Sequence, residues 1–183
     1  TVDINNPYTK VISGYKGMWP EEGNYGTEST STQALNAEKL GYGNVVAATN
    51  VCLNWYTDAY YKANPHLIGE PIGYTILDGE YYENSQGPTW GAQNCIVINY
   101  DKHPITGEER PSDMKKVWMR STSDPLTGWE EQVIPVQFAW LVKPDPVTGE
   151  PVNQYKTENY AGGTSRTFVG VKEDGTLVVA VSD

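Results

Sequence analysis

The sequence is poor in the residues that metal sites and nucleophilic triads require, because its 183 residues include two cysteines and two histidines. Cys52 and Cys95 stand far apart, and His66 and His103 each adjoin a proline, which is typical of loop residues. These positions form no metal-ligand spacing, and no cysteine stands beside a histidine. We therefore expect no metal, no cofactor and no triad of a nucleophile with histidine.

Positive charge is scarce as well. Thirteen Lys and Arg residues against twenty-three Asp and Glu residues give a net charge of -10. A chain of this sign repels polyanions over long range. No apolar run approaches the roughly 20 residues of a membrane span, and the first residues lack the pattern of a signal peptide. We expect no nucleic-acid partner and no membrane span, and in a secreted protein the signal would precede Thr1.

The surroundings of the two cysteines leave two interpretations open. Both Cys52 and Cys95 stand next to Val, Leu, Ile or Asn in largely apolar stretches, which is typical of small buried residues. The alternative is a single disulfide between them, of the kind found in proteins from oxidising compartments. The residues favour neither interpretation over the other.

What the chain does hold is abundant Gly, Pro, Tyr and Trp with 38% hydrophobic residues, which indicates a turn-rich globule containing β-structure. One helix is predicted at 32–40, where Ser and Thr can cap its start and Gly41 and Gly43 end it. Alternating or apolar runs predict strands at 8–12, 45–49, 74–77, 81–82, 95–100, 117–120 and 136–142.

These elements predict an α+β fold, with a mixed, mainly antiparallel sheet and a few helices. Residues 1–31 are rich in turn formers and are predicted to be an irregular N-terminal segment. Residues 32–183 are predicted to form the domain. Within it, 101–135 carries two turn-like clusters around one strand and is predicted to be a β insertion.

The end of the chain, residues 166–183, predicts a hairpin, because Asp174-Gly175 stands between two Val-rich runs. A two-residue type I′ loop would place Arg166 directly opposite Asp183. Both faces of such a ribbon would be apolar, which predicts burial on both sides. Since nothing after Asp183 is there to cover it, we expect exposed apolar surface around Val179 and Val181.

Four stretches resemble the phosphodiester glycosidase family, in the family's own order: NVVAATN (44–50), GEPIGYTILDGEYY (69–82), FAWLVKPD (138–145) and SRTFVGVKEDGTLVVAVSD (165–183). The resemblance covers about 32–183, and its last stretch is the most specific. After Asn50 this chain has Val-Cys-Leu-Asn where the family has Gly and aromatic residues, and Ser165 replaces the usual Pro. The family continues with Gly-Arg, which implies that this chain stops inside the domain. The expected remainder is either a second polypeptide or part of a longer polypeptide that contains this sequence.

The resemblance implies hydrolysis of a sugar-1-phosphodiester in a glycan or glycolipid. That chemistry needs a carboxyl group near the anomeric carbon and a cation or donor that holds the phosphate. Asp183 is accordingly the catalytic carboxyl candidate and Arg166 the phosphate-holding one, and Asn50, Asn54 and Thr167 are the substrate-binding candidates. Read without the resemblance, an Arg opposite an Asp is a surface ion pair worth about 0–1 kcal/mol.

The expected protein is therefore secreted or at the cell surface, bacterial, and partnered by a glycan or sugar-phosphate substrate. The alternative is a non-catalytic extracellular module for carbohydrate binding or surface assembly, which the departures after Asn50 favour. Abundant Trp and Tyr would suit a sugar-stacking surface, although most such rings simply pack in cores or on surfaces.

Overall fold

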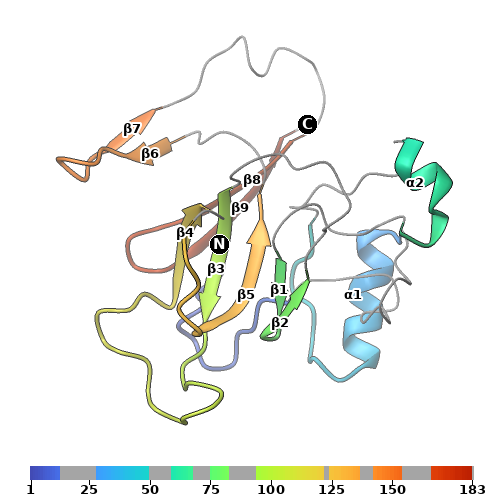
Figure 1. Ribbon diagram of the computed structural model, residues 1–183, viewed down its shortest axis with the longest axis horizontal. Coiled ribbons are helices and arrows are strands. Elements are labelled where there is room, and N and C mark those ends of the chain that lie inside the picture. Colours follow the sequence, from blue (N-terminus) through green and yellow to red (C-terminus); the bar gives the residue numbers. More distant parts are fainter. Residues whose placement is uncertain are drawn as a thin grey trace.

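The computed structural model describes residues 1–12, 28–49, 59–67, 75–82, 94–121, 124–136, 142–153 and 166–182. Its helices are α1 (Thr30–Lys39), α2 (Ala59–Ala63) and the short 3-10 helix η1 (Pro65–Leu67). Its strands are β1 (Thr75–Leu77), β2 (Glu80–Tyr82), β3 (Asn94–Asn99), β4 (Val117–Ser121), β5 (Glu130–Pro135), β6 (Val142–Pro144), β7 (Pro151–Asn153), β8 (Arg166–Val171) and β9 (Leu177–Ser182). Every strand pair is antiparallel, so the predicted α+β fold is confirmed (Figure 1).

Helix α1 begins and ends where the capping residues of the sequence predict, within two residues. The Oγ atom of Ser29 accepts a hydrogen bond from the backbone N–H of Thr32 at 3.2 Å. At the other end, Gly41 has φ +87° and the N–H of Tyr42 donates to the carbonyl of Ala37 at 3.1 Å. This pair of features is a Schellman motif, which stops the helix because the left-handed residue turns the chain away.

The main sheet has five strands in the order β2-β1-β5-β3-β4. Its centre is β5, which pairs with β1 at Ile76↔Val133 and with β3 at Val97↔Val133. Strand β4 forms one edge through pairs such as Ile96↔Met119. Both β4 and β5 come from 101–135, so the stretch with the predicted β insertion supplies two strands of this sheet.

Each face of the main sheet carries its own apolar cluster, because side chains alternate along a strand. On one face Ile96, Ile98 and Val117 pack with Ile4 and with Leu177 of β9. The hairpin β8-β9 therefore forms a second layer against β3 and β4, while the β6-β7 hairpin extends away from the sheet (Figure 1). The opposite face buries Ile76, Cys95, Val97 and Val133, with Trp118 against them.

The terminal hairpin is present, but its register is shifted by one residue from the prediction. Val171 pairs with Leu177, and Arg166 pairs with Ser182. The loop has three residues, since the N–H of Lys172 donates to the carbonyl of Thr176 at 2.9 Å. The prediction that Arg166 lies directly opposite Asp183 is therefore wrong.

The longer loop has a local cause. The Oδ1 atom of Asp174 accepts the N–H of Thr176 at 2.8 Å, and the N–H of Gly175 donates to the carbonyl of Lys172 at 3.0 Å. Gly175 alone in this loop has positive φ, at +84°. A turn followed by one left-handed residue is the usual three-residue hairpin loop, and it moves the strands by one position relative to a type I′ loop.

The expectation that this ribbon is buried on both sides is also wrong. The register places Val169 and Val171 on one face with Leu177 and Val179, and that face packs against the core. The other face holds Phe168, Gly170, Val178 and Ala180, none of which is fully buried. Val181, at the end of β9, is 63% exposed as predicted, whereas Val179 packs against the core cluster.

Two predicted strands near the N-terminus, at 8–12 and 45–49, are irregular instead. Tyr8 is 96% exposed and Val46 is 87% exposed. The N–H of Val45 donates to a carboxylate oxygen of Glu38 at 3.0 Å, where a strand would donate to a neighbouring strand. A short apolar run becomes a strand when another strand pairs with it, and no described strand pairs here. The strand predicted at 136–142 lies mostly outside the described residues.

Candidate functional site

Several of the predicted site residues lie outside the described part of the chain. These are Asn50, Asn54, Asp183 and Cys52. For Arg166 the structure describes the backbone, as the first residue of β8. Thr167 is described in full and is partly buried. The structure thus locates Arg166 and Thr167 at the start of the second layer.

Two segments that resemble the glycosidase family meet at Thr167. Its hydroxyl oxygen lies 3.4 Å from the hydroxyl oxygen of Thr49, although 118 positions separate the two in sequence. Thr49 immediately precedes Asn50, and Thr167 immediately follows Arg166. The contact therefore brings the positions next to two predicted site residues together, in a partly buried place.

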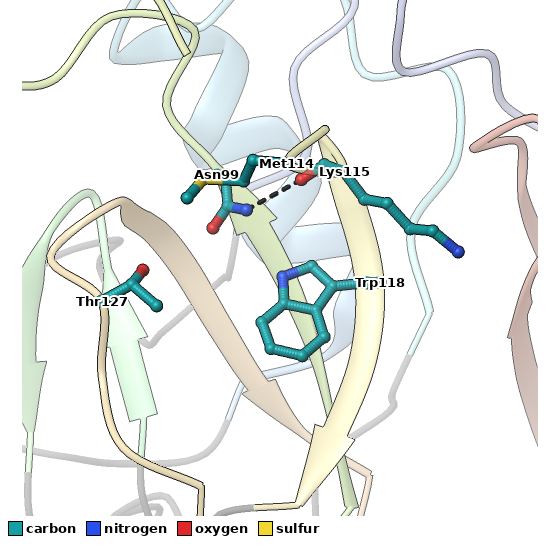
Figure 2. Close-up of a pocket in the computed structure, with 5 residues that line it drawn as sticks. All are labelled: Asn99, Met114, Lys115, Trp118 and Thr127. Atoms are coloured by element: carbon teal, nitrogen blue, oxygen red, sulfur yellow. Dashed lines mark hydrogen bonds between the residues drawn. The ribbon is translucent and has the colours of Figure 1, made fainter. Parts of the chain in front are cut away.

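A separate pocket of about 220 Å³ lies on the other side of the main sheet, where β3 ends and β4 begins. Figure 2 shows its lining, which we call the Trp118 pocket: Asn99, Met114, Lys115, Trp118 and Thr127. Asn99 and Trp118 point to the same side as Val97, since Trp118 pairs with Val97 and Asn99 is two residues further along β3. That side is opposite to the one covered by the β8-β9 hairpin.

Of the buried side-chain polar atoms that line this pocket, the Oδ1 atom of Asn99 is the one without a hydrogen-bond partner among the described residues. The residue is 2% exposed, and its Nδ2 atom donates to the carbonyl of Lys115 at 2.8 Å. Its Oδ1 atom has no hydrogen-bond partner there and points toward the space between Thr127 and Trp118 (Figure 2). An unpaired buried acceptor costs about 1–3 kcal/mol, so a donor at this position would bind favourably.

Glu130 fixes the loop that brings Thr127 to the pocket. Its Oε1 atom accepts from both the N–H and the hydroxyl of Thr127 at 2.9 Å, and its Oε2 atom accepts from the N–H of Gly128 at 2.9 Å. Burial by itself raises the pKa of Glu130, but these hydrogen bonds outweigh it and the pKa is lowered. The side chain is therefore a buried carboxylate that holds a loop rather than a proton donor.

Arg120 lies beside the Trp118 ring and forms an ion pair with the carboxylate of Glu130. Its side chain is 1% exposed, and its Nη1 atom is 3.6 Å from Oε1 of Glu130. The guanidinium carbon lies 5.7 Å from the centroid of the Trp118 ring, within reach of a cation–π interaction. Arg120 and Glu130 thus position the aromatic wall and the loop of the Trp118 pocket.

Cys95 is a buried free thiol in the structure. Its Sγ atom is 3.5 Å from the carbonyl oxygen of Arg120, and burial raises its pKa to about 11. For Cys95 the structure agrees with the first interpretation, a small buried residue with a free thiol. Cys52 lies outside the described residues. Burial thus keeps this thiol protonated at neutral pH, which disfavours a nucleophilic role for Cys95.

Sequence reasoning did not single out Asn99, Trp118, Arg120 or Glu130. One signal was available: Arg120 ends an apolar strand two residues after an aromatic side chain, where a charge needs a partner. The sequence does not reveal that Glu130 is this partner. Arg120 lies in β4 and Glu130 in β5, and the two strands come together only because each of them pairs with β3.

Within the described ranges, no three His, Cys, Asp or Glu side chains gather closely enough to hold a metal ion. None of the helices described there is both long enough and apolar enough to cross a membrane. Comparisons of the chain with protein-family models, curated proteins and solved structures gave no match. The resemblance to phosphodiester glycosidases therefore rests on the four sequence stretches.

Proposed function

We propose that this protein hydrolyses a sugar-1-phosphodiester in a glycan or glycolipid, as a secreted or cell-surface enzyme. The observation that supports the proposal is the 3.4 Å contact between Thr49 and Thr167. These residues adjoin Asn50 and Arg166, for which the family resemblance implies binding roles. A shared binding site requires these two family-like segments to lie side by side, and the contact meets that requirement.

In this proposal Arg166 holds the phosphate, because its planar guanidinium can donate two parallel hydrogen bonds to phosphate oxygens. Asn50, Asn54 and Thr167 bind the sugar or phosphate oxygens. Asp183 supplies the carboxyl group that assists departure of the phosphate from the anomeric carbon. The corrected register removes the cross-strand argument for Asp183, so its role rests on the resemblance alone and needs its own variant.

The activity test uses a chromogenic sugar-1-phosphodiester and the full polypeptide that contains this sequence. We expect Arg166→Lys to lose about 100-fold in turnover while the protein stays folded, because an ammonium group cannot reproduce the paired hydrogen bonds. Lys172→Ala, a change to another cation of the same hairpin, is the matched control and should keep full turnover. Wild-type turnover by Arg166→Lys would remove Arg166 from the mechanism.

Asp183→Asn is tested in the same assay, and we expect the larger loss for it because the carboxyl group takes part in the bond cleavage itself. Unchanged turnover in this variant would exclude Asp183 while leaving Arg166 in place. Absence of turnover in the unmodified protein, combined with glycan binding, would support the non-catalytic alternative.

The juxtaposition itself has a test that needs no activity. A Thr49→Cys and Thr167→Cys double variant should form a disulfide under mild oxidation, because the two side-chain oxygens are 3.4 Å apart. Peptide mapping would identify the new bridge against the native cysteines. The matched control pairs Thr49→Cys with Thr176→Cys, in the loop at the far end of the hairpin, and should stay reduced. Absence of the bridge in the first variant would contradict the contact on which the proposal depends.

A further inference from the structure

We propose that the Trp118 pocket binds one uncharged sugar ring, at a site separate from the one proposed for phosphodiester hydrolysis. The two places lie on opposite sides of the main sheet, because Trp118 belongs to the cluster of Ile76, Cys95, Val97 and Val133, whereas the hairpin with Thr167 packs on the other face. The proposal therefore does not depend on whether the chain hydrolyses anything.

The size of the pocket suits a single ring. Its volume is about 220 Å³, which at ~30 Å³ for each molecule corresponds to about seven waters. Pockets for larger organic ligands usually start at about 300 Å³. A ligand of one ring with its hydroxyl groups matches this space, and the rest of a longer glycan would extend into solvent.

The lining suits a ring that is apolar on one face and rich in hydroxyl groups at its edge. Trp118 offers an aromatic surface whose negative face attracts the C–H groups of a sugar, and Met114 adds an adaptable apolar contact. The Oδ1 atom of Asn99 needs a donor, which a sugar hydroxyl supplies. The indole nitrogen lies on the edge of the ring nearer Asn99, so a donor and an acceptor stand at the same end of the pocket (Figure 2).

The charges around the pocket favour a neutral ligand. The Lys115 side chain extends away from the space between Thr127 and Trp118 (Figure 2). Lys116 is paired with Asp101 at 2.8 Å. The carboxylate of Glu130 already accepts hydrogen bonds from the neighbouring loop. Lys115 is the one charged residue of the lining, and because its ammonium group points away from this space, neither an anion nor a cation finds a charged partner inside. The net charge of -10 further disfavours anions.

The groups that would bind the sugar are held in place before it arrives. The backbone N–H of Asn99 donates to Lys116 at 2.8 Å, and its side chain donates to Lys115 at the same distance. Trp118 has Arg120 beside its ring, and Thr127 is tied to Glu130. A binding site whose side chains are already fixed loses little entropy when a ligand binds.

The experiment uses methyl glycosides of glucose, galactose, mannose and N-acetylglucosamine, which are uncharged and carry no phosphodiester. Binding is followed by saturation-transfer difference NMR and quantified by titration. We expect at least one of them to bind with Kd on the order of 1 mM, the affinity typical of a few weak contacts. Trp118→Ala should weaken that binding at least about tenfold, Trp118→Phe less, and Asn99→Ala several-fold.

Trp129→Ala is the matched control, because Trp129 lies in the same region, edge-on to His103 at 4.8 Å, but does not line the pocket. It should bind the glycoside as the unmodified protein does, and circular dichroism checks that each variant is folded. The proposal is overturned if no glycoside binds, if Trp129→Ala loses as much as Trp118→Ala, or if glucose 1-phosphate binds this pocket more tightly than methyl glucoside. Since the readout is binding without turnover, its failure is distinguishable from failure of the proposed hydrolysis.

Discussion

The chain contains the same dipeptide, Asp-Gly, in two hairpins, and the two loops differ. Between β1 and β2 the loop has two residues, with Leu77 paired to Glu80, and both Asp78 and Gly79 have positive φ, +46° and +81°. Between β8 and β9 the loop has three residues and only its glycine is left-handed. Identical dipeptides therefore permit a turn without determining its length.

The neighbours of each loop explain the difference. The β1-β2 loop is held by the main sheet, since the N–H of Gly79 donates to the carbonyl of Glu131 at 2.9 Å and Gln132 donates to Asp78 at 2.5 Å. In the β8-β9 loop the Asp174 side chain bonds to its own loop, at the N–H of Thr176. Tertiary contacts thus select the tight loop, and local hydrogen bonds favour the wider one.

The largest expected effect comes from Gly79→Ala. A Cβ atom at this position would meet the hydroxyl of Tyr100, and φ is +81°. We expect a loss of ~3 kcal/mol in the free energy of unfolding, from backbone strain and overpacking together. Urea denaturation measures it. In a Tyr100→Phe background the hydroxyl is gone, so the loss should fall by about half, and an undiminished loss would contradict the proposed clash.

A smaller effect is expected from Gln132→Ala, which removes the anchor of Asp78 from the sheet. Gln132 is 1% exposed, and its loss leaves a small cavity and one fewer hydrogen bond to a carboxylate. We expect a loss of about 2 kcal/mol. The matched control is Asn5→Ala, which removes the exposed bond from Nδ2 to the carbonyl of Asp174 at 3.0 Å and should change stability by less than about 0.5 kcal/mol. Equal losses would show that both loops depend on tertiary anchors alike.

Gly175→Ala should cost only about 1 kcal/mol, mostly from its left-handed backbone. The added Cβ atom would lie 3.2 Å from Nδ2 of Asn5, a flexible exposed side chain that can move. Gly175→Asn is the control, since Asn tolerates positive φ and should lose less. If Gly175→Ala lost as much stability as Gly79→Ala, the difference between a loop held by the main sheet and a loop held by its own hydrogen bonds would not hold.

The smallest effect concerns pH at the β8-β9 loop. Hydrogen bonds from the side chain and the backbone N–H of Thr176 lower the pKa of Asp174 below its ordinary value of 3.8. A lowered pKa in the folded state adds stability above the unfolded pKa, and that stability is lost as pH falls through the folded pKa. NMR titration of the Asp174 carboxyl group should therefore give a midpoint below 3.8. Thr176→Val should bring the midpoint closer to 3.8, and an unchanged midpoint would contradict the role of its hydroxyl.

Sequence reasoning succeeded where structure depends on neighbouring residues. Helix α1 was predicted to within two residues, because its start and end are made by Ser29 and Gly41. Strands β3 and β4 were predicted from their apolar runs. Strand β5 was missed, because it buries Glu130 and Gln132, and such residues are acceptable inside only when distant groups pair with them.

The candidate sites divide in the same way. Chemistry-bearing residues such as Arg166 and Thr167 could be named from their sequence stretch, and their hairpin was predicted. Their cross-strand partners could not be named from the sequence. The register depends on a hydrogen bond of the Asp174 side chain, which the Asp-Gly dipeptide does not specify. A shift by one residue changes which side chain lies opposite Arg166.

By itself the sequence determined the class of fold, the helix caps, the positions of both Asp-Gly turns and the acidic charge that disfavours polyanions. Tertiary structure alone decided which strands pair in the main sheet, the anchoring of the tight β1-β2 loop, and the Trp118 pocket. That pocket exists only because β3 pairs with both β4 and β5, so that Asn99, Trp118 and Thr127 lie around one space. Caps and turns arise from contacts within a few residues, whereas a pocket arises from side chains that only the folded sheet brings together.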